Sequence, residues 1–320
     1  MLRALLLYFS RASWARRVVT RWSVAWRVAG RFIAGETLDE AVALVKQLNA
    51  DGYYVTLDHL GENTTNEAEA IRAAADAVEI LERIRTDGLR SGLSIKLTQI
   101  GLAIDSGLCE RNLEQVLAGA HAHGIFVRID MEDSPHVEAT LALLGRMLVR
   151  FGVETVGVAL QSYLYRARED AVALGAGAVR IRLVKGAYQE PETVAFPDKA
   201  DVDAEFDRIT DILIEATCRA GMPVGRRDGR CPPILAIASH DDLRVDYARE
   251  AAEAAGVPRQ AVEFQMLNGI RRDLQKELLE AGYPVRIYVP FGREWYPYMV
   301  RRLAERPANL LFFLSNLVRR

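Results

Sequence analysis

Short runs of β-branched and aliphatic residues alternate with longer segments rich in alanine, leucine and glutamate from residue 52 onward. Each short run has the length and composition of a buried β-strand, and each long segment has those of a helix. Several helical segments stop at a glycine, as at Gly124, Gly221 and Gly282. The predicted strands are residues 53–58, 93–98, 126–131, 156–161, 179–186, 235–240, 262–267 and 285–290.

This alternation predicts an α/β fold in which parallel strands pair through helical crossovers. Eight such units over roughly 250 residues are what a closed (βα)8 barrel of the TIM type requires. An open doubly wound sheet would need a glycine-rich turn between its first strand and helix, and GAGAVR at residues 175–180 opens a strand instead. Residues 189–201 and 225–233 are predicted loops on either side of the fifth helix.

Residues 1–45 are predicted to form a basic helical arm, and residues 46–320 a barrel domain. Residues 1–35 contain seven arginines and no acidic residue, with leucine, phenylalanine and tryptophan interleaved. Such a segment could cover the core with its arginines in water, or it could contact an anionic membrane surface. The apolar run near the start is too short for a membrane span and lacks the pattern of a secretory signal.

Composition narrows the function classes. The 320 residues are half hydrophobic and carry a net charge of −2, which gives no overall attraction to nucleic acid. Cys109, Cys218 and Cys231 form neither a disulfide framework nor a metal-ligand spacing, so a reducing cytoplasm fits best and no metal site is predicted.

Polar residues gather at the carboxyl-terminal ends of the predicted strands. In (βα)8 barrels, this end carries the active site. Any one of these residues could belong to a buried structural ion pair, or be a core histidine whose hydrogen bonds are all made. Residues with purely structural roles would not all lie at the same end of the strands. The residues are Asp58, Lys96, Asp130, Gln161, Arg182, Lys185, Ser239, His240, Gln265 and Tyr288.

Two chemistries fit these residues. Lys96 or Lys185 could form a Schiff base, as in a barrel lyase. Alternatively, Lys96, Arg182 and Lys185 could bind an anionic cofactor and an anionic substrate, with Gly186 allowing phosphates to approach the backbone. A barrel that binds the ligand without catalysis is a third interpretation.

A predicted helix near the carboxyl terminus raises a separate question. Tyr298, Arg301, Arg302 and Glu305 lie at positions i, i+3, i+4 and i+7, so they share one helix face. This face could be an ordinary solvated surface. It could also present two guanidinium groups as a fork for a carboxylate.

Six motifs together resemble the proline dehydrogenase family, in its monofunctional bacterial form and in the matching domain of bifunctional proline utilisation enzymes. The resemblance covers about residues 30–313. It implies a distorted (βα)8 barrel that binds FAD without a Rossmann domain and oxidises L-proline to 1-pyrroline-5-carboxylate. Hydride would pass to FAD and electrons to a quinone, in the cytoplasm or at the inner face of the membrane. The motifs are VTLDHLGE, SIKLTQIG, RIDMEDS, RIRLVKGAY, EFQMLNGI and YVPFGREWYPYMVRRLAERPAN.

The resemblance also implies a set of FAD contacts. Arg182 would lie near the flavin N5, Gln161 would hydrogen-bond the isoalloxazine, and Lys185, Gly186 and Ala187 would contact the phosphates and ribose. Ser239 and His240 match a Thr–His pair at the adenosine side, and the serine keeps the hydroxyl. Asp130, Met131 and Val184 complete the implied cofactor contacts.

The implied substrate site completes this interpretation. Lys96 would clamp the proline carboxylate together with Arg301 and Arg302, and Glu305 would orient an arginine. Asn268 stands where relatives often carry an aromatic residue. Asp130, Leu267, Tyr288 and Tyr298 would line the pocket. Asp130 and Arg182 are the predicted catalytic residues.

Overall fold

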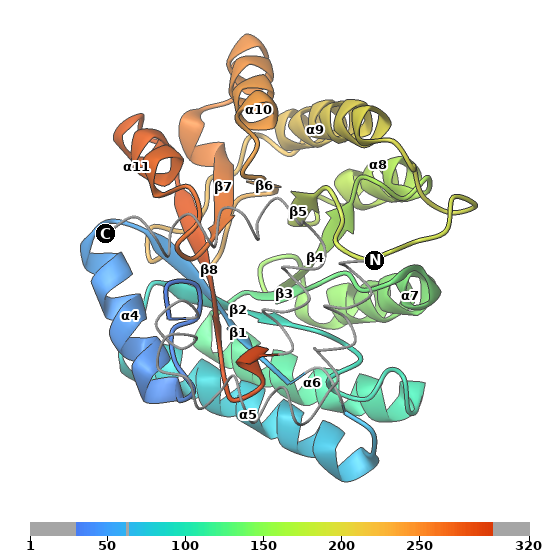
Figure 1. Ribbon diagram of the computed structural model, residues 1–320, viewed down its shortest axis with the longest axis vertical. Helices are drawn as coiled ribbons and strands as arrows, with labels where there is room; N and C mark the ends of the chain where they lie inside the picture. The colour runs from blue at the N-terminus through green and yellow to red at the C-terminus, as the bar shows by residue number, and fades with distance from the viewer. Residues whose placement is uncertain (1–29, 62–63, 297–320) are drawn as a thin grey trace.

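The computed structural model describes residues 30–61 and 64–296 of the chain. Its centre is a closed barrel in which eight strands pair in sequence order, and every neighbouring pair is parallel. Figure 1 looks down this barrel, with the helices arranged around it. The strands are β1 (Tyr54–His59), β2 (Ser91–Ile95), β3 (Val127–Ile129), β4 (Val156–Gln161), β5 (Ile181–Val184), β6 (Leu235–Ala238), β7 (Val262–Leu267) and β8 (Val285–Phe291).

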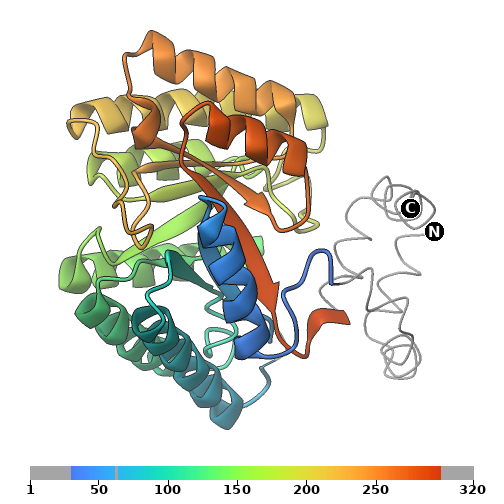
Figure 2. The ribbon, with the colours of Figure 1, turned by 90° about the vertical axis from the view of Figure 1, so that its left-hand side faces the viewer.

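Helices cover the outside of the barrel. One helix precedes β1 and lies along β8 and β1, where Figure 2 shows it in blue in front of the last strand. Each of the first seven strands is followed by an α-helix, as a parallel barrel requires. The helices are α4 (Leu38–Ala50), α5 (Glu67–Thr86), α6 (Ser106–His123), α7 (Ser134–Phe151), α8 (Ala167–Ala176), α9 (Lys199–Arg219), α10 (Asp242–Ala254) and α11 (Arg272–Glu280), with a short 3-10 helix η1 (Arg259–Ala261) before β7.

Side-chain caps define several helix starts. Thr37 and Glu40 form a capping box at the start of α4. The Thr37 hydroxyl accepts the Glu40 N–H, and the Glu40 carboxylate accepts the Thr37 N–H. The carboxylate of Asp105 accepts the Leu108 N–H at 2.6 Å and begins α6. Gly124 ends α6 with φ 61°, a left-handed conformation that glycine adopts without strain. This glycine stop was predicted from the sequence.

All eight predicted strands are confirmed: β4 and β7 have the predicted bounds, β8 is one residue longer, and the other five are shorter or shifted. The run 179–186 contains only β5 (Ile181–Val184), and the run 93–98 overlaps β2, which begins at Ser91 and ends at Ile95. Lys96 and Asp130 therefore lie one residue beyond their strands rather than inside them. Hydrophobic composition extends past the last ladder hydrogen bond, so composition overestimates a strand that ends in an active-site loop.

The aliphatic core lies between the barrel and its helices. Val55, Leu57 and Ile129 are fully buried on the outward face of their strands, against the apolar faces of the helices. The barrel interior is different, because charged and polar side chains fill much of it. The predicted domain boundary between residues 45 and 46 falls inside α4, whose Val42 and Val45 belong to this core.

Candidate active site

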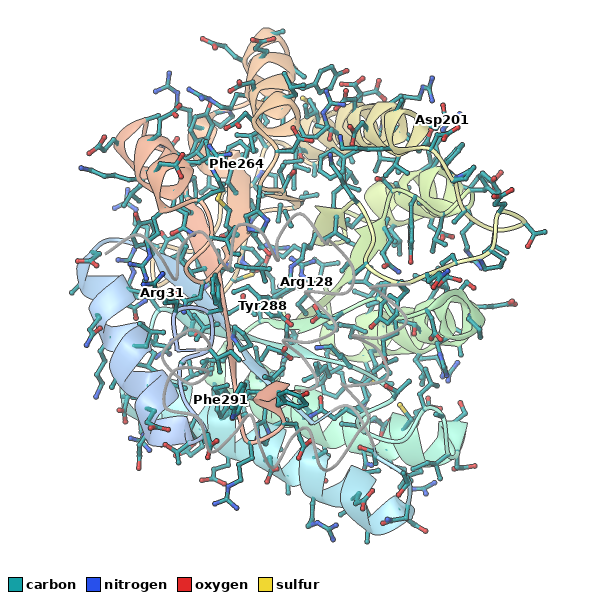
Figure 3. All side chains as sticks on the ribbon, in the orientation of Figure 1. Arg31, Arg128, Asp201, Phe264, Tyr288 and Phe291 are labelled. Carbon is teal, nitrogen blue, oxygen red and sulfur yellow. The ribbon has the colours of Figure 1, made fainter. Side chains whose placement is uncertain are left out.

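Alternation along the strands directs the predicted polar residues into one end of the barrel. Asp58 lies near the end of β1, Tyr288 lies on β8, and Lys96 and Asp130 follow β2 and β3. Because the carboxyl ends of parallel strands meet at one edge of a barrel, closure brings these side chains together. Figure 3 shows Tyr288 near the barrel axis, far from Asp201 on the outer helix α9.

Asp130 is the centre of the resulting network. Its carboxylate accepts hydrogen bonds from the Tyr288 hydroxyl at 2.7 Å and from the Ser94 hydroxyl at 3.1 Å, and it pairs with Arg182. The Arg182 guanidinium also donates to Gln265 at 2.6 Å, and its Cζ lies 5.2 Å from the Tyr288 ring centre. One carboxylate therefore orients an arginine and a phenol at the mouth of the barrel.

Lys96 links this network to the first strand. Its ammonium lies 3.0 Å from one Asp58 oxygen and 3.5 Å from an Asp130 oxygen, and both Lys96 and Asp58 are buried. Burial raises the pKa of Asp58 against the opposing pull of Lys96. Burial acts in the same direction on Asp130, but Arg182 and then Lys96 outweigh it and hold the pKa of Asp130 below its ordinary value. Asp130 therefore stays charged at neutral pH.

Tyr288 remains a neutral hydrogen-bond donor over a wide pH range. Burial raises its pKa well above the ordinary value, and the negative charge of Asp130 adds to this. The phenol can therefore donate to Asp130 throughout the range in which the protein would work.

The predicted cofactor residues lie along four neighbouring strands, β3 to β6. Asp130 and Met131 follow β3, Gln161 ends β4, Arg182 and Val184 lie on β5, and Ser239 and His240 follow β6. The Gln161 amide donates to the Glu132 carbonyl at 2.8 Å, and the His240 Nε2 accepts the Leu267 N–H at 3.0 Å. His240 is therefore held by the backbone at the end of β7, which fixes its ring.

Lys185 and Gly186 follow β5 and have contacts that the sequence did not suggest. The Lys185 ammonium pairs with Asp203 of α9 and with Asp241, whose carboxylate lies at 2.5 Å. Gly186 has φ 120°, and a Cβ at this position would collide with the Tyr163 ring. The glycine is therefore required by the fold itself, in addition to any approach of a ligand.

Three of the predicted substrate residues lie among the described residues and three do not. Lys96 and Tyr288 belong to the Asp130 network, and Leu267 ends β7 beside them through its pairing with Tyr288. Tyr298, Arg301 and Arg302 lie outside the described residues, as does Glu305. Their roles therefore stay predictions.

A second buried layer lies below this network, and the sequence reasoning missed it. Arg286 pairs with Glu263 at 2.7 Å and 3.0 Å, and Glu263 also accepts from Gln265 at 2.6 Å. Arg128 lies in the same region, two residues before Asp130. The missed signal was the period of two along a strand, since Arg128, Glu263 and Arg286 each share a face with a predicted site residue.

The fold and this network define the class of the protein as a (βα)8-barrel enzyme with a charged site at the carboxyl-terminal edge. The sequence model of one family, described as proline dehydrogenase, matches residues 41–314. The chain belongs to the proline dehydrogenase family.

Relatives of similar length support this membership. The chain is 39% identical over 297 residues to the proline dehydrogenase of Deinococcus radiodurans, covering 92% of this chain and 91% of that protein. It is 38% identical over 323 residues to proline dehydrogenase 1 of Bacillus subtilis strain 168, with full coverage of both. The family predicted from the six motifs is thus confirmed.

Solved structures of larger proteins contain a similar barrel. The proline utilization A protein of Bdellovibrio bacteriovorus, inactivated by N-propargylglycine, matches with a TM-score of 0.78 and 25% identity. The match covers 87% of this chain but only 32% of that one. The likeness therefore concerns one domain of the larger protein, and the predicted (βα)8 barrel is confirmed.

Proposed function

We propose that this protein oxidises L-proline to 1-pyrroline-5-carboxylate with FAD as its cofactor and a quinone as the electron acceptor. The observation that carries the proposal is the network of Asp130, Arg182, Tyr288 and Lys96 at the mouth of the barrel. It lies inside the segment that matches the proline dehydrogenase family. Family membership supports the reaction, and the network supplies the groups that an amino-acid substrate requires.

The residues on β3 to β6 fit a flavin nucleotide. They lie on neighbouring strands and carry amide, guanidinium, ammonium and imidazole groups. These hydrogen-bond donors suit a polar ring system and a diphosphate. Gln161 and Arg182 would hold the ring, while Lys185, Ser239 and His240 would hold the nucleotide end. When bound, FAD supplies the hydride acceptor.

The ion pairs of Lys185 with Asp203 and Asp241 affect how it could contact a phosphate. Both carboxylates bind its ammonium group, and both would repel a diphosphate at close range. We infer that Lys185 keeps one carboxylate and turns its remaining hydrogens toward the nucleotide. A lysine has three donors, so Lys185 can contact a phosphate and still keep one of its two carboxylate partners.

The substrate side lies on the other strands. Lys96 presents an ammonium beside Asp58 and Asp130, and Tyr288 and Leu267 stand on the neighbouring strands β8 and β7. Because Asp58 and Asp130 already neutralise Lys96, this lysine alone would attract the carboxylate of proline only weakly. The predicted fork of Arg301 and Arg302 would supply the further positive charge.

The protein residues position the substrate and control charge. Asp130 stays ionised because Arg182 and Lys96 lower its pKa against its burial, which makes it a poor proton acceptor. Its role is to orient Arg182 and Tyr288, which face the reaction centre. No strong protein base is required, since the amine of proline needs only to lose a proton before hydride leaves.

A Schiff-base lyase is the second candidate, and the ion pairs oppose it. A lysine must be a neutral amine to attack a carbonyl group. Lys96 contacts Asp58 and Asp130, and Lys185 contacts Asp203 and Asp241, so carboxylates already engage the nitrogen of both lysines. Neither lysine has the apolar surroundings that activate an amine.

The quinone would meet the enzyme at a membrane. Among the described residues, no helix combines the length and the apolar character needed to cross a bilayer. We propose that the basic residues 1–29, which lie outside the described residues, bring the protein to the membrane surface as a peripheral contact.

Visible spectroscopy tests the proposed function. Purified protein is expected to be yellow, and anaerobic L-proline is expected to bleach the flavin absorption, whereas D-proline serves as the control of identical composition. A colourless protein that takes up no FAD would overturn the flavin assignment. Borohydride trapping of a carbonyl substrate on Lys96 or Lys185 would instead support the lyase.

A further inference from the structure

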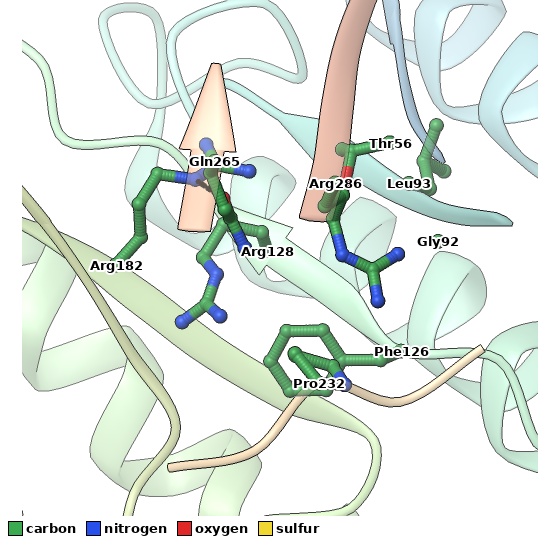
Figure 4. A pocket seen from close by; sticks show the side chains of 9 residues that line it. All are labelled: Thr56, Gly92, Leu93, Phe126, Arg128, Arg182, Pro232, Gln265 and Arg286. Atoms are coloured by element: carbon green, nitrogen blue, oxygen red, sulfur yellow. Dashed lines mark hydrogen bonds between the residues drawn. The ribbon is translucent and has the colours of Figure 1, made fainter. Parts of the chain in front are cut away.

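A small cavity lies inside the barrel, toward the amino-terminal ends of the strands from the network around Asp130. It has a volume of about 10 Å³, close to the roughly 10–15 Å³ that one water-sized sphere needs. Three arginines face it, and Figure 4 shows their side chains together with the ring of Phe126. The lining residues are Thr56, Gly92, Leu93, Phe126, Arg128, Arg182, Pro232, Gln265 and Arg286.

Arg128 is the lining residue whose contacts are incomplete. Its side chain is 2% exposed, and Nη1 donates to the carbonyl oxygens of Val158, at 3.0 Å, and of Arg180. Its Nε and Nη2 are buried and donate to no described residue. Buried donors without a partner are rare in folded proteins and point to a bound water or ion.

The charges around Arg128 favour an anion over water. Arg182 and Lys96 share Asp130 and Asp58, and Arg286 pairs with Glu263. Arg128 forms no ion pair with any residue that the structure describes, so the interior holds one cation without a carboxylate. A buried charge is tolerated only when it is paired, because the dry interior screens it poorly.

Close packing holds Arg128 in place beside the cavity. A Cβ at Gly157 on β4 would lie 2.8 Å from the Phe126 ring and 3.2 Å from Arg128 Nη1, so only glycine fits there. The Arg128 guanidinium stacks on the Phe126 ring at 4.7 Å, which fixes its plane. The arginine is thus held rigidly with two donors in the interior.

We propose that this cavity binds one small monovalent anion of the size of chloride, with Arg128 as its main donor and Arg286 and Arg182 as flanking positive charges. Glu263 and Asp130 are the nearby negative charges, and each is already neutralised by an arginine. Because Arg182 also contacts Asp130, the anion would complete the charge balance below the proposed flavin site.

Crystals grown in bromide test the site directly. Bromide scatters anomalously, so we expect an anomalous peak in the cavity beside Arg128 Nε and Nη2. Ordinary density at this position without an anomalous signal, after exchange into bromide, would identify a water and overturn the proposal. This measurement uses the unmodified FAD-containing enzyme and needs no variant.

Thermal unfolding in matched salts gives a second test. The melting temperature is expected to rise by roughly 5 °C between 1 and 100 mM chloride, relative to glutamate at equal ionic strength, if the anion binds near 1 mM. Arg128→Met should lose this response, and Arg128→Lys should keep part of it. Arg219→Met, which removes an exposed arginine on α9, should respond as wild type does. Equal responses of wild type and Arg128→Met, or a fold that fails in Arg128→Met combined with no bromide peak in wild type, would overturn the assignment.

Discussion

Two buried layers inside the barrel, the network around Asp130 and the layer of Glu263 and Arg286, contain the same residue types but have different roles. In the upper layer, one carboxylate, Asp130, serves Arg182, Tyr288, Ser94 and Lys96 at the open carboxyl-terminal edge. In the lower layer, Glu263 is committed to Arg286 in a two-contact pair, and both are at most 2% exposed. A shared carboxylate leaves its cations able to contact a substrate or cofactor, while the two-contact pair of Glu263 and Arg286 holds the fold. We therefore expect upper-layer changes to alter turnover and lower-layer changes to alter stability.

The largest expected effect is on stability, from Glu263→Gln in the lower layer. It leaves Arg286 buried without its counter-charge, which typically costs about 3–5 kcal/mol. Urea unfolding measures the loss. Glu154→Gln is the matched control: its partner Arg180 is also buried, but Glu154 is 62% exposed and the pair reaches solvent. The control should lose about 1 kcal/mol or less. Equal losses of unfolding free energy in the two variants would mean that burial does not make the Glu263–Arg286 pair more important for stability.

Arg182→Met tests the upper layer through the chemical step. We expect FAD content to stay normal and reduction by proline to slow about a hundredfold, as when one preorganised charge is removed from an active site. Asp130 keeps Lys96 and Tyr288 as partners, so the fold should survive. Stopped-flow spectroscopy gives the rate, and Arg180→Met, two residues away on the same chain segment, is the control. Native kinetics in Arg182→Met would make this arginine structural, like Arg286.

Arg302→Lys tests whether the predicted helix near the carboxyl terminus, which lies outside the described residues, completes the upper layer. The lysine keeps the charge but loses the planar fork, and a hydrogen bond to a charged group contributes roughly 1.5–3 kcal/mol. We expect KM for proline to rise about ten- to a hundredfold. A proline analogue without the carboxylate should lose little, because it never used the fork. Unchanged KM and kcat in both Arg301→Lys and Arg302→Lys would return this face to ordinary solvated surface.

The smallest expected effect is a change of pH dependence in Tyr288→Phe. Burial raises the pKa of Tyr288 in the folded protein, so above pH 10 the unfolded chain loses this proton first. Stability should therefore fall as pH rises above 10, by at most about 1.4 kcal/mol per pH unit for one group. Urea midpoints between pH 9.5 and 11 should show a shallower decline in Tyr288→Phe than in wild type. Parallel declines would mean that the phenol is not shielded as the structure indicates.

Most of the architecture could be predicted from local patterns. Strand–helix alternation predicted the barrel, and Gly124 ends α6 where the sequence predicted a helix stop. Positions at strand ends identified Asp130, Arg182 and Tyr288, because parallel strands in a closed barrel all end at one edge. These features depend on neighbours within a few residues, or on a rule of topology, so one sequence is enough to find them.

The partners inside the barrel depended on the tertiary structure. Asp130 meets Arg182 across 52 residues of chain and Tyr288 across 158, and Lys96 meets Asp58 across 38. Composition cannot tell which of several buried cations a carboxylate will meet, because strand register decides it. Register and barrel closure also place Arg128 beside Gly157 and Phe126 with two buried donors unused. The sequence by itself determined which residues are charged and which face of a strand they occupy. Only the closed barrel decided which of them meet, because an ion pair depends on the distance between two groups in space and not along the chain.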